Sequence, residues 1–347
     1  MRLAILTPNL PPIACGLADH SRLLGAALMD CAHEVTLIGK NGSPRAAFAS
    51  GWRGGATLWN GSSPGLLDLL GGDPPDCLFV QLSGYGYSRW GAPLELAKAL
   101  RKVGTEFARM QLAICVHETH CDAWQLGLKG LLLSWWQKHT VGAVVRSADI
   151  VFATIPTWRD RCIECYGIDP VRIQILPLGA SFPFMEATPA LRQMWRANLG
   201  LAASDKVALA LGRWDTQRSA LERFEAPLAK ALMRGEVTQV VALGGESPDL
   251  PRWAKEWVSR PEWVGRLRFL GPQTAERVAE SVAAADIGLV PTPFHLWEKS
   301  TVAKAFQQAD VTIWVCEEGS THRVLKDQRA VPTWPELGGW VSDRLQQ

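Results

Sequence analysis

The feature that most restricts the fold of this chain is a repeated alternation of short apolar runs with longer helical patterns. The segment between the first two runs, Leu17–Met29, places Leu24 and Leu28 on one helical face. Runs rich in Val, Ile and Leu occur in the first half at Leu3–Leu6, Val35–Ile38, Cys77–Val80, Leu112–Val116, Ile150–Ile155 and Ile173–Leu176. Continuous apolar strands separated by helices predict a parallel sheet covered on both faces.

The same alternation restarts after an interruption. Residues 182–189 contain turn-forming residues without any period, which predicts a linker. The second set of runs is Val207–Leu211, Val237–Leu243, Leu267–Leu270, Ile287–Val290 and Val311–Val315. We therefore expect an α/β protein with two Rossmann-like parallel-sheet domains, residues 1–182 and 183–330, and a C-terminal helix in 331–347 packing back towards the first domain. Such folds bind ligands at the carboxyl ends of their strands, here across a cleft.

Composition narrows the function classes. Hydrophobic residues make up 47% and charged residues 20% of the chain, as in ordinary globular proteins, and a net charge of +2 gives no reason to expect a nucleic-acid partner. The chain opens on a strand rather than a leader, and no apolar run is long enough for a membrane helix. Cys162 and Cys165 form an isolated CxxC in a helical pattern, which favours reduced thiols over a zinc or redox site. These features predict a cytoplasmic protein without a bound metal.

Two loops of the second domain carry groups that suit a phosphorylated ligand. Arg213 and Arg218 follow the first strand of that domain, and two guanidinium groups at this spacing can converge on a diphosphate. Ser300 and Thr301 stand where a helix begins, where free backbone N–H groups attract phosphate, and Glu298 just before them can accept hydrogen bonds from sugar hydroxyls. The structural alternatives are two solvated arginines and an ordinary serine cap beside a loop acid.

Polar groups also follow strands of the first domain. Gly16 begins a helix, and the open backbone there can face an anion, although the fingerprint GxGxxG is absent and a tight turn is the alternative. His117 comes directly after a strand and forms an HxxH with His120. Because no third ligand is evident, His117 is either a hydrogen-bonding residue for a sugar or a structural histidine.

Two further segments of the first domain suggest acceptor or surface contacts. Residues 81–93 are rich in Gly, Tyr and Trp, and Tyr85 and Tyr87 suit sugar contacts, with a loop packed on its own domain as the alternative. Residues 131–139 are apolar, then aromatic, then cationic. That pattern allows peripheral membrane contact, but burial inside the domain is the favoured interpretation.

Taken in order along nearly the whole chain, these motifs resemble the large retaining GT-B glycosyltransferase family, known as family four or group 1. The matching passages are Pro11–Gly16, His33–Val35, Ala148–Val151, Ile175–Gly179, Gly212–Arg213 with Arg218, Leu270–Gly271, Ala285–Ile287 and Val290–Pro291. The resemblance implies a GT-B fold and a hexosyltransferase-type activity in polysaccharide or glycoconjugate biosynthesis. A nucleotide sugar would be the co-substrate, with no cofactor or metal, and the acceptor would be a glycan, a lipid-linked sugar or a small molecule.

The resemblance also assigns roles to individual residues. Arg213 and Arg218 would bind the donor diphosphate, and Gly16 would lie beside the phosphates. His117 would contact the donor sugar, and Glu298 would be the first acid of the E-x7-E motif. His117 and Glu298 are therefore the catalytic candidates of this sequence.

One departure from the family pattern bears on activity. Phe306 stands eight residues after Glu298 and Ala305 one position earlier, so the second acid, which usually holds the nucleotide ribose, is absent; Asp310 replaces a common Gly in the following turn. The sequence therefore leaves two main hypotheses, an active retaining transferase and a catalytically degenerate protein that binds nucleotide or glycan. An epimerase or a pseudo-glycosyltransferase is a third.

Overall fold

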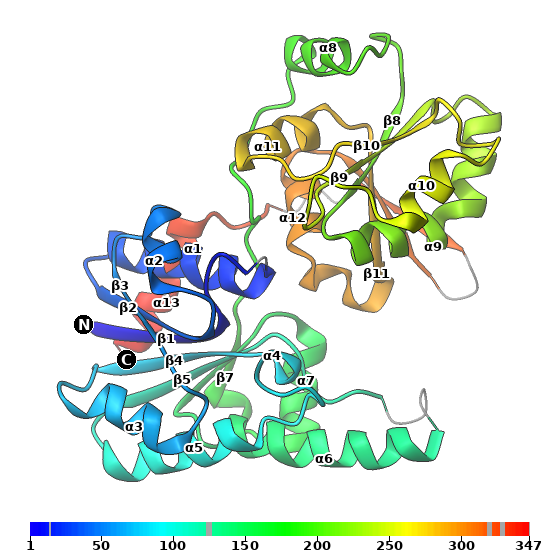
Figure 1. The fold of residues 1–347 in the computed structure, drawn as a ribbon. Helices are drawn as coiled ribbons and strands as arrows, with labels where there is room; N and C mark the ends of the chain where they lie inside the picture. The colour runs from blue at the N-terminus through cyan, green and yellow to red at the C-terminus, as the bar shows by residue number, and fades with distance from the viewer. Residues whose placement is uncertain (14, 123–126, 318–320, 327–329, 347) are drawn as a thin grey trace. The chain divides into compact units, whose positions relative to one another are not determined.

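The chain forms two compact units, each built on its own sheet (Figure 1). The computed structural model describes all residues except 14, 123–126, 318–320, 327–329 and 347. Unit 1 comprises Met1–Pro177 and Pro332–Gln347, and unit 2 comprises Leu178–Val331. The units meet in sequence at Pro177–Leu178, five residues before the predicted boundary at 182. The expected pair of Rossmann-like α/β sheets is confirmed.

The sheet of unit 1 has seven parallel strands in the order β3-β2-β1-β4-β5-β6-β7. The strands are β1 (Arg2–Asn9), β2 (Glu34–Asn41), β3 (Gly55–Leu58), β4 (Cys77–Leu82), β5 (Gln111–Val116), β6 (Ile150–Ala153) and β7 (Ile173–Ile175). Most of their residues are buried, which explains their continuous apolar runs. The strand order reverses between β1 and β4, so the switch point of this sheet lies between their carboxyl ends.

Helices cover both faces of this sheet. They are α1 (Gly16–Asp30), α2 (Pro44–Ala49), α3 (Ser63–Gly71), α4 (Gly84–Tyr87), α5 (Leu94–Glu106), α6 (Gly127–Arg146), α7 (Pro156–Tyr166), the 3-10 turn η2 (Pro170–Arg172) and the C-terminal α13 (Trp334–Leu345). Leu28 of α1 and Val341 of α13 pack in one core with Phe79 and Phe152 of the sheet. A Cβ on Gly338 would lie 2.7 Å from the Cβ of Ala27, so the glycine allows α13 to approach α1 closely.

Helix α6 departs from the expectation that residues 131–139 are buried. Leu131, Leu132, Trp135 and Trp136 are exposed, so the burial interpretation is wrong for these side chains. The buried face of α6 is instead partly polar. The Gln137 amide donates to the Tyr85 hydroxyl at 3.0 Å and to the Trp90 carbonyl at 2.7 Å, which fixes the rotation of the helix against the neighbouring loop.

The sheet of unit 2 has six strands in the order β10-β9-β8-β11-β12-β13, with only the edge strand β13 antiparallel. The strands are β8 (Val207–Leu211), β9 (Gln239–Leu243), β10 (Leu267–Phe269), β11 (Ile287–Pro293), β12 (Thr312–Cys316) and β13 (His322–Leu325). The helices are α8 (Pro189–Asn198), α9 (Trp214–Met233), α10 (Arg252–Val258), α11 (Ala275–Ala284), the 3-10 turn η3 (Phe294–Lys299) and α12 (Thr301–Gln308). Buried cores lie on both faces of the sheet.

Some sequence expectations concern single residues of this fold. Cys162 and Cys165 both lie in α7 and are free thiols; burial raises the pKa of Cys162 to about 12, which keeps it protonated. Within the described ranges, no cluster of His, Cys, Asp or Glu is arranged to hold a metal ion. No helix in the described part of the chain combines the length and the apolarity needed to cross a bilayer.

Candidate functional site

Two loops of unit 2 follow the two strands on either side of the switch point of its sheet. Strands β8 and β11 pair in parallel, Leu209 opposite Gly288, and the strand order reverses between them. The loop after β8 leads into α9 and carries Arg213, and the loop after β11 leads through η3 into α12 and carries Glu298 and Ser300. The structure therefore brings the predicted donor loops to the same edge of one sheet, where open α/β folds bind their ligands.

The loop after β8 is tightly packed against the neighbouring loop after β9. Gly212 has a φ of 137° and Gly244 a φ of 111°, and a Cβ on Gly244 would lie 2.4 Å from the Gly212 carbonyl oxygen. Buried Gln217 donates from its amide to the same oxygen at 2.7 Å. The backbone just before Arg213 is therefore held from two sides.

Arg213 is positioned by an acid from that neighbouring loop. The Arg213 Nε donates to one carboxylate oxygen of Glu246 at 2.8 Å, and the backbone N–H of Trp214, the first residue of α9, donates to the other at 3.1 Å. Arg213 Nε also lies 3.7 Å from Asp215. The hydrogen bond to Glu246 uses Nε, and within the part of the chain that the structure describes the two terminal amino groups of Arg213 donate no hydrogen bond.

Arg218 is held differently from Arg213. It lies one turn further into α9, and its Nε donates to Glu222 at 2.7 Å, an i,i+4 pair on the exposed face of the helix. This is the geometry of an ordinary surface pair, which contributes little to stability. Of the two predicted cations, Arg213 is therefore the one that the loop structure fixes.

The loop after β11 ends in a capped helix. Ser300 accepts a hydrogen bond from the Ala303 N–H at 3.2 Å, so the predicted serine cap is confirmed, and Thr301 is the first residue of α12. Glu298 lies in η3 beside buried Trp297, and the ammonium group of buried Lys304 lies 5.1 Å from the Trp297 ring centroid. The Lys304 ammonium donates to Gln307 at 3.3 Å, so this cation of α12 is held between Trp297 and Gln307.

The positions that would carry the family's second acid are apolar and buried. Phe306 and Ala305 are both buried. The Phe306 ring packs directly on Gly288, because a Cβ added to that glycine would lie only 2.3 Å from the ring. Asp310 has a φ of 53°, the left-handed conformation that glycine adopts most easily. The end of α12 thus has the backbone turn expected of a glycine but provides no carboxylate at position 305 or 306.

A smaller prediction follows from the cap of α12. Replacing Ser300 with alanine should lower the stability of unit 2 by about 1 kcal/mol because the helix loses a side-chain cap. Because the first turn of α12 would fray, we also expect the affinity for a nucleoside diphosphate to fall by roughly two- to five-fold. Calorimetry would measure this affinity.

The matched control is Thr274→Ala. Thr274 caps α11 through the Arg277 N–H at 3.4 Å, in the same unit but not beside the switch point. The Thr274→Ala variant should lose a similar amount of stability and keep the native affinity for the nucleotide. Equal affinity losses in both variants would argue against a role for the α12 N-terminus.

In unit 1, the start of α1 leaves its backbone donors accessible. Gly16 is the first residue of the helix, and its preceding residue Cys15 makes no side-chain cap. A Cβ added to Gly16 would meet no described atom within 4 Å, so the space beside this helix start is open among the residues that the structure covers. The site is suited to an approaching anion.

His117 lies at the carboxyl end of β5 in a polar cluster. Its Nε2 is 2.6 Å from Gln81 Oε1, and its ring centroid is 4.8 Å from that of His20 in α1. With the amide oxygen facing it, Nε2 carries the proton and Nδ1 remains an acceptor. Burial, and secondly the neighbouring His20, hold the pKa of His117 well below its usual value, so the ring is neutral.

His117 and His120 do not form a joint site. His120 Nδ1 lies 2.9 Å from the Tyr166 hydroxyl, a separate contact. Next to His117, Glu118 accepts a hydrogen bond from Ser83 at 2.9 Å, which joins the ends of β4 and β5.

The two predicted acceptor tyrosines differ in exposure. Tyr85 is exposed, and its hydroxyl meets Gln137. Tyr87 is buried, and its hydroxyl donates to the Leu6 carbonyl at 3.1 Å. Tyr87 therefore holds α4 against β1 and offers no surface to a sugar, and of the pair only Tyr85 keeps the predicted accessibility.

Sequence reasoning did not find three residues that shape these edges. Glu246, Gln81 and His20 position Arg213 or His117, and each lies far along the chain from the residue that it contacts. Gln81 and Glu246 do share one signal: each stands at or just after the carboxyl end of a predicted strand.

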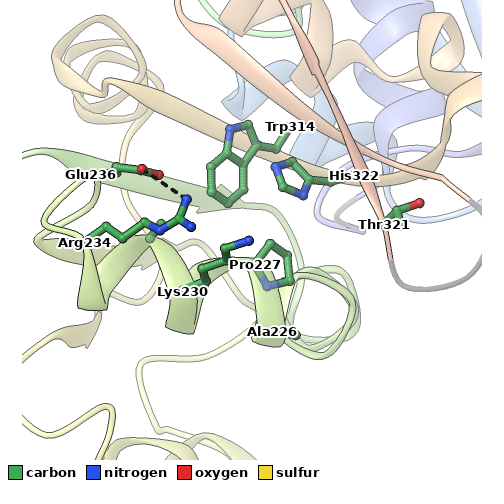
Figure 2. Close-up of a pocket in the computed structure, with 9 residues that line it drawn as sticks. Ala226, Pro227, Lys230, Arg234, Glu236, Trp314, Thr321 and His322 are labelled. Carbon is green, nitrogen blue, oxygen red and sulfur yellow. Dashed lines mark ion pairs between the residues drawn. The ribbon is translucent and has the colours of Figure 1, made fainter.

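The pocket shown in Figure 2 lies away from the donor loops. Its cavity volume is about 460 Å³, and its walls come from the second half of α9 and from β12 and β13. The rings of Trp314 and His322 lie 4.3 Å apart between centroids and are tilted by 34°, and Arg234 points to Glu236. Pro227 in its wall is about 20 Å along α9 from the helix start, so the pocket is distinct from the Arg213 loop.

A comparison with protein families finds a match in the first unit. Residues 16–179 match the model described as a glycosyl transferase 4-like domain. This match covers most of unit 1, including Gly16, His117 and strand β4 at the switch point, whereas β1 precedes it. The first unit of the chain is thus similar to group 1 glycosyltransferases, and the two sheets have the GT-B fold.

Curated proteins similar to this chain match over part of their length. A D-inositol 3-phosphate glycosyltransferase of Mycobacteroides abscessus is 30% identical over 154 residues, 43% of this chain and 33% of that protein. A mannosylfructose-phosphate synthase of Agrobacterium fabrum is 31% identical over 161 residues, 44% of this chain and 34% of that protein. The chain thus spans about a third of the length of these two relatives.

Solved structures with the same fold match over the whole chain. HepE of Anabaena, solved in complex with UDP, has a TM-score of 0.62 at 14% identity, covering 100% of this chain and 90% of that one. A sucrose-phosphate synthase from Thermosynechococcus elongatus has a TM-score of 0.64 at 15% identity, covering 99% and 94%. At these identities, the similarity shows the GT-B fold alone.

Proposed function

We propose that this protein is a glycosyltransferase that moves a hexose from a nucleotide-sugar donor to a glycan, lipid-linked or small-molecule acceptor. The observation that carries the proposal is the pair of loops at the β8–β11 switch point, where Arg213 and the capped start of α12 follow adjacent parallel strands. A fixed guanidinium and a helix N-terminus at one sheet edge suit a diphosphate. The UDP complex of HepE, with the same fold, is in keeping with a nucleotide ligand.

The residues have distinct roles in the proposed reaction. Arg213, with Arg218 as a second cation, neutralises charge on the leaving diphosphate, together with the N–H groups of Thr301 and the turn behind it. Glu298 accepts hydrogen bonds from sugar hydroxyls. The chemistry needs no metal, because protein groups supply the positive charge.

Unit 1 supplies neutral hydrogen-bonding groups. His117 has Nδ1 as its acceptor, which suits a hydroxyl of the donor sugar, and Gly16 leaves backbone N–H groups for the phosphates. No protein nucleophile is needed if the leaving phosphate takes the acceptor's proton on the same face of the sugar, which gives retention. Exposed Tyr85 is the acceptor-side candidate.

The experiment combines binding with turnover. Calorimetry with UDP, GDP and ADP should find one preferred nucleoside diphosphate, and the matching nucleotide glucoses and mannoses should release that diphosphate when an acceptor is present. Product stereochemistry read by NMR at the anomeric carbon should show retention. If none of the three nucleotides binds, the proposed donor site is wrong.

The missing second acid favours one alternative. Since positions 305 and 306 carry no carboxylate, the ribose lacks the partner that the family resemblance implies, and a degenerate protein that binds nucleotide or glycan without turnover is the second candidate. Tight nucleotide binding with no donor consumed, for every acceptor tried, would support that candidate over the transferase.

A further inference from the structure

Helix α6 buries Val141, Val144 and Val145 in its second half, but around residues 131–140 its apolar and polar faces are reversed relative to a helix that covers a sheet. Its buried face includes Ser134, Gln137 and Thr140. Its exposed face carries Leu131, Leu132, Trp135 and Trp136, which we call the α6 ridge; Leu132 is 73% and Trp135 61% exposed. Amphipathic helices on globular domains normally turn this kind of face inward. An exposed cluster of four large apolar side chains marks an interaction surface.

The charged residues of α6 itself have one sign. Helix α6 contains Lys129, Lys138 and Arg146 and no Asp or Glu along its length. Lys129 and Lys138 are exposed, one on each side of the ridge in sequence. A helix with Trp and Leu on one face and lysines beside them is typical of segments that lie in the interface of an anionic bilayer.

A loop in contact with α6 carries a further exposed tryptophan. Trp90 is exposed, and the guanidinium of Arg89 lies 5.5 Å from its ring centroid. The Trp90 carbonyl accepts a hydrogen bond from Gln137 of α6, so the loop and the helix are neighbours. A tryptophan paired with a cation is the combination that residues at a membrane–water interface commonly show.

The dimensions argue against a second copy of the chain as the occupant. Residues 131–139 extend about 12 Å along the helix axis. A stable protein interface takes roughly 800 Å² from each partner, far more than a strip one helix wide and this long. A bilayer needs only a few interfacial side chains together with electrostatic attraction.

We propose that the α6 ridge, flanked by Lys129 and Lys138, docks unit 1 on the surface of a membrane that contains anionic phospholipids. Leu132 and Trp135 enter the boundary between headgroups and acyl chains, and the two lysines meet lipid phosphates. The helix lies in the plane of the interface and does not cross the bilayer. This inference stands apart from the proposed transfer reaction, because it needs neither donor nor acceptor.

The test is flotation of the full-length protein with phosphatidylcholine vesicles, with and without about 30% phosphatidylglycerol. The protein should float with the anionic vesicles, and Leu132→Ser with Trp135→Ser should lower the bound fraction at least ten-fold (roughly). The double variant Lys129→Glu, Lys138→Glu should also lower the bound fraction, and its remaining binding should no longer depend on salt concentration. The matched control is Val171→Ser, an exposed apolar residue of the same unit away from α6, which should bind like the native chain.

Each remaining outcome contradicts the proposal. Failure of the native protein to float, or equal flotation of the serine variant, overturns it. A concentration-dependent dimer that the serine variant abolishes would assign the ridge to a second copy instead. Because these residues are exposed, the variants should keep the native circular dichroism, and calorimetry with the nucleoside diphosphates on the same samples tests the donor proposal separately.

Discussion

Replacing Arg213 with alanine should lower kcat/KM for the sugar-nucleotide donor by about 10²- to 10³-fold, if the protein is the transferase that we propose. The reason is geometric. Glu246 binds Nε of Arg213 at 2.8 Å and so fixes the side chain, while the terminal amino groups keep their capacity to fork around a phosphate. Removing one such pre-positioned donor costs about 3 to 4 kcal/mol of transition-state stabilisation.

The same change should have little effect on folding. The Arg213 side chain is more than half exposed and caps no backbone group. Loss of an exposed ion pair typically costs less than about 1 kcal/mol, so the melting temperature should shift by only a few degrees. A large drop in melting temperature would mean that Glu246, left without its partner, disturbs the start of α9.

The control for this prediction is Arg252→Ala. Arg252 forms an exposed i,i+4 pair with Glu256 on α10, in the same unit, and carries the same charge. It should leave turnover within about two-fold of the native value, because it only weakens the overall potential. Equal activity of native protein and Arg213→Ala would contradict the donor assignment. Equal losses in both variants would mean a general charge effect.

How far the sequence predicts this molecule depends on the range of the interactions concerned. The period of the apolar runs is local, and it correctly predicted both sheets and the helix starts at Gly16 and Ser300. Strands β3 and β13 were missed because they are four-residue edge strands with few buried residues, so their patterns lack a continuous apolar run.

The partners of the site residues could not be predicted, because the sheet register places them. Leu211 pairs with Leu243, and this register is what brings Glu246 beside Arg213. The sequence separation of 33 residues gives no sign of the contact. Gln81 reaches His117 in the same way, through the pairing of Leu82 with Val116.

The orientation of α6 shows a different limit. Its sequence is apolar on nearly every side, which gives no preferred face, and burial was the natural interpretation. The structure instead selects the face with Gln137, because its amide joins α6 to two groups of the 85–90 loop. The buried face thus combines these polar contacts with Val141, Val144 and Val145, and leaves the apolar residues 131, 132, 135 and 136 exposed.

The second large effect concerns acid stability and arises from His20 of α1. This imidazole is 1% exposed, and neither ring nitrogen has a hydrogen-bond partner among the residues that the structure describes. It packs edge to face against His117 at 4.8 Å and Trp334 of α13 at 5.2 Å. Burial lowers the pKa of His20 to about 4, because a charged ring in this site would have no compensating partner.

The sign of the pH effect follows from this shift. The unfolded chain binds a proton at His20 with a pKa near 6.5, whereas the folded chain does so only near 4. Between these values the unfolded state holds more protons, so stability falls as the pH decreases through that window. A pKa shift of this size lowers the free energy of unfolding by about 3 kcal/mol in total. The loss is absent above roughly pH 6.5 and has its full size below about pH 4.

His20→Phe should remove this part of the acid sensitivity. The phenyl ring keeps the aromatic contacts with His117 and Trp334 and cannot be protonated. The quantity to measure is the difference in free energy of unfolding between variant and native protein, from urea denaturation at about pH 7.5 and about pH 4.5. The variant should gain about 2 to 3 kcal/mol relative to the native protein on going to the lower pH.

The comparison between variant and native protein at each pH cancels the titration of other groups, apart from His117. The pKa of His117 is lowered partly by His20, so removing His20 should relieve part of that lowering. This effect adds to the stability that the variant gains over the native protein at acid pH. His139→Phe, at an exposed position on α6, is the matched control and should show no such gain. A His20→Phe variant that loses stability in parallel with the native chain between the two pH values would show that His20 is not the group buried neutral in the fold.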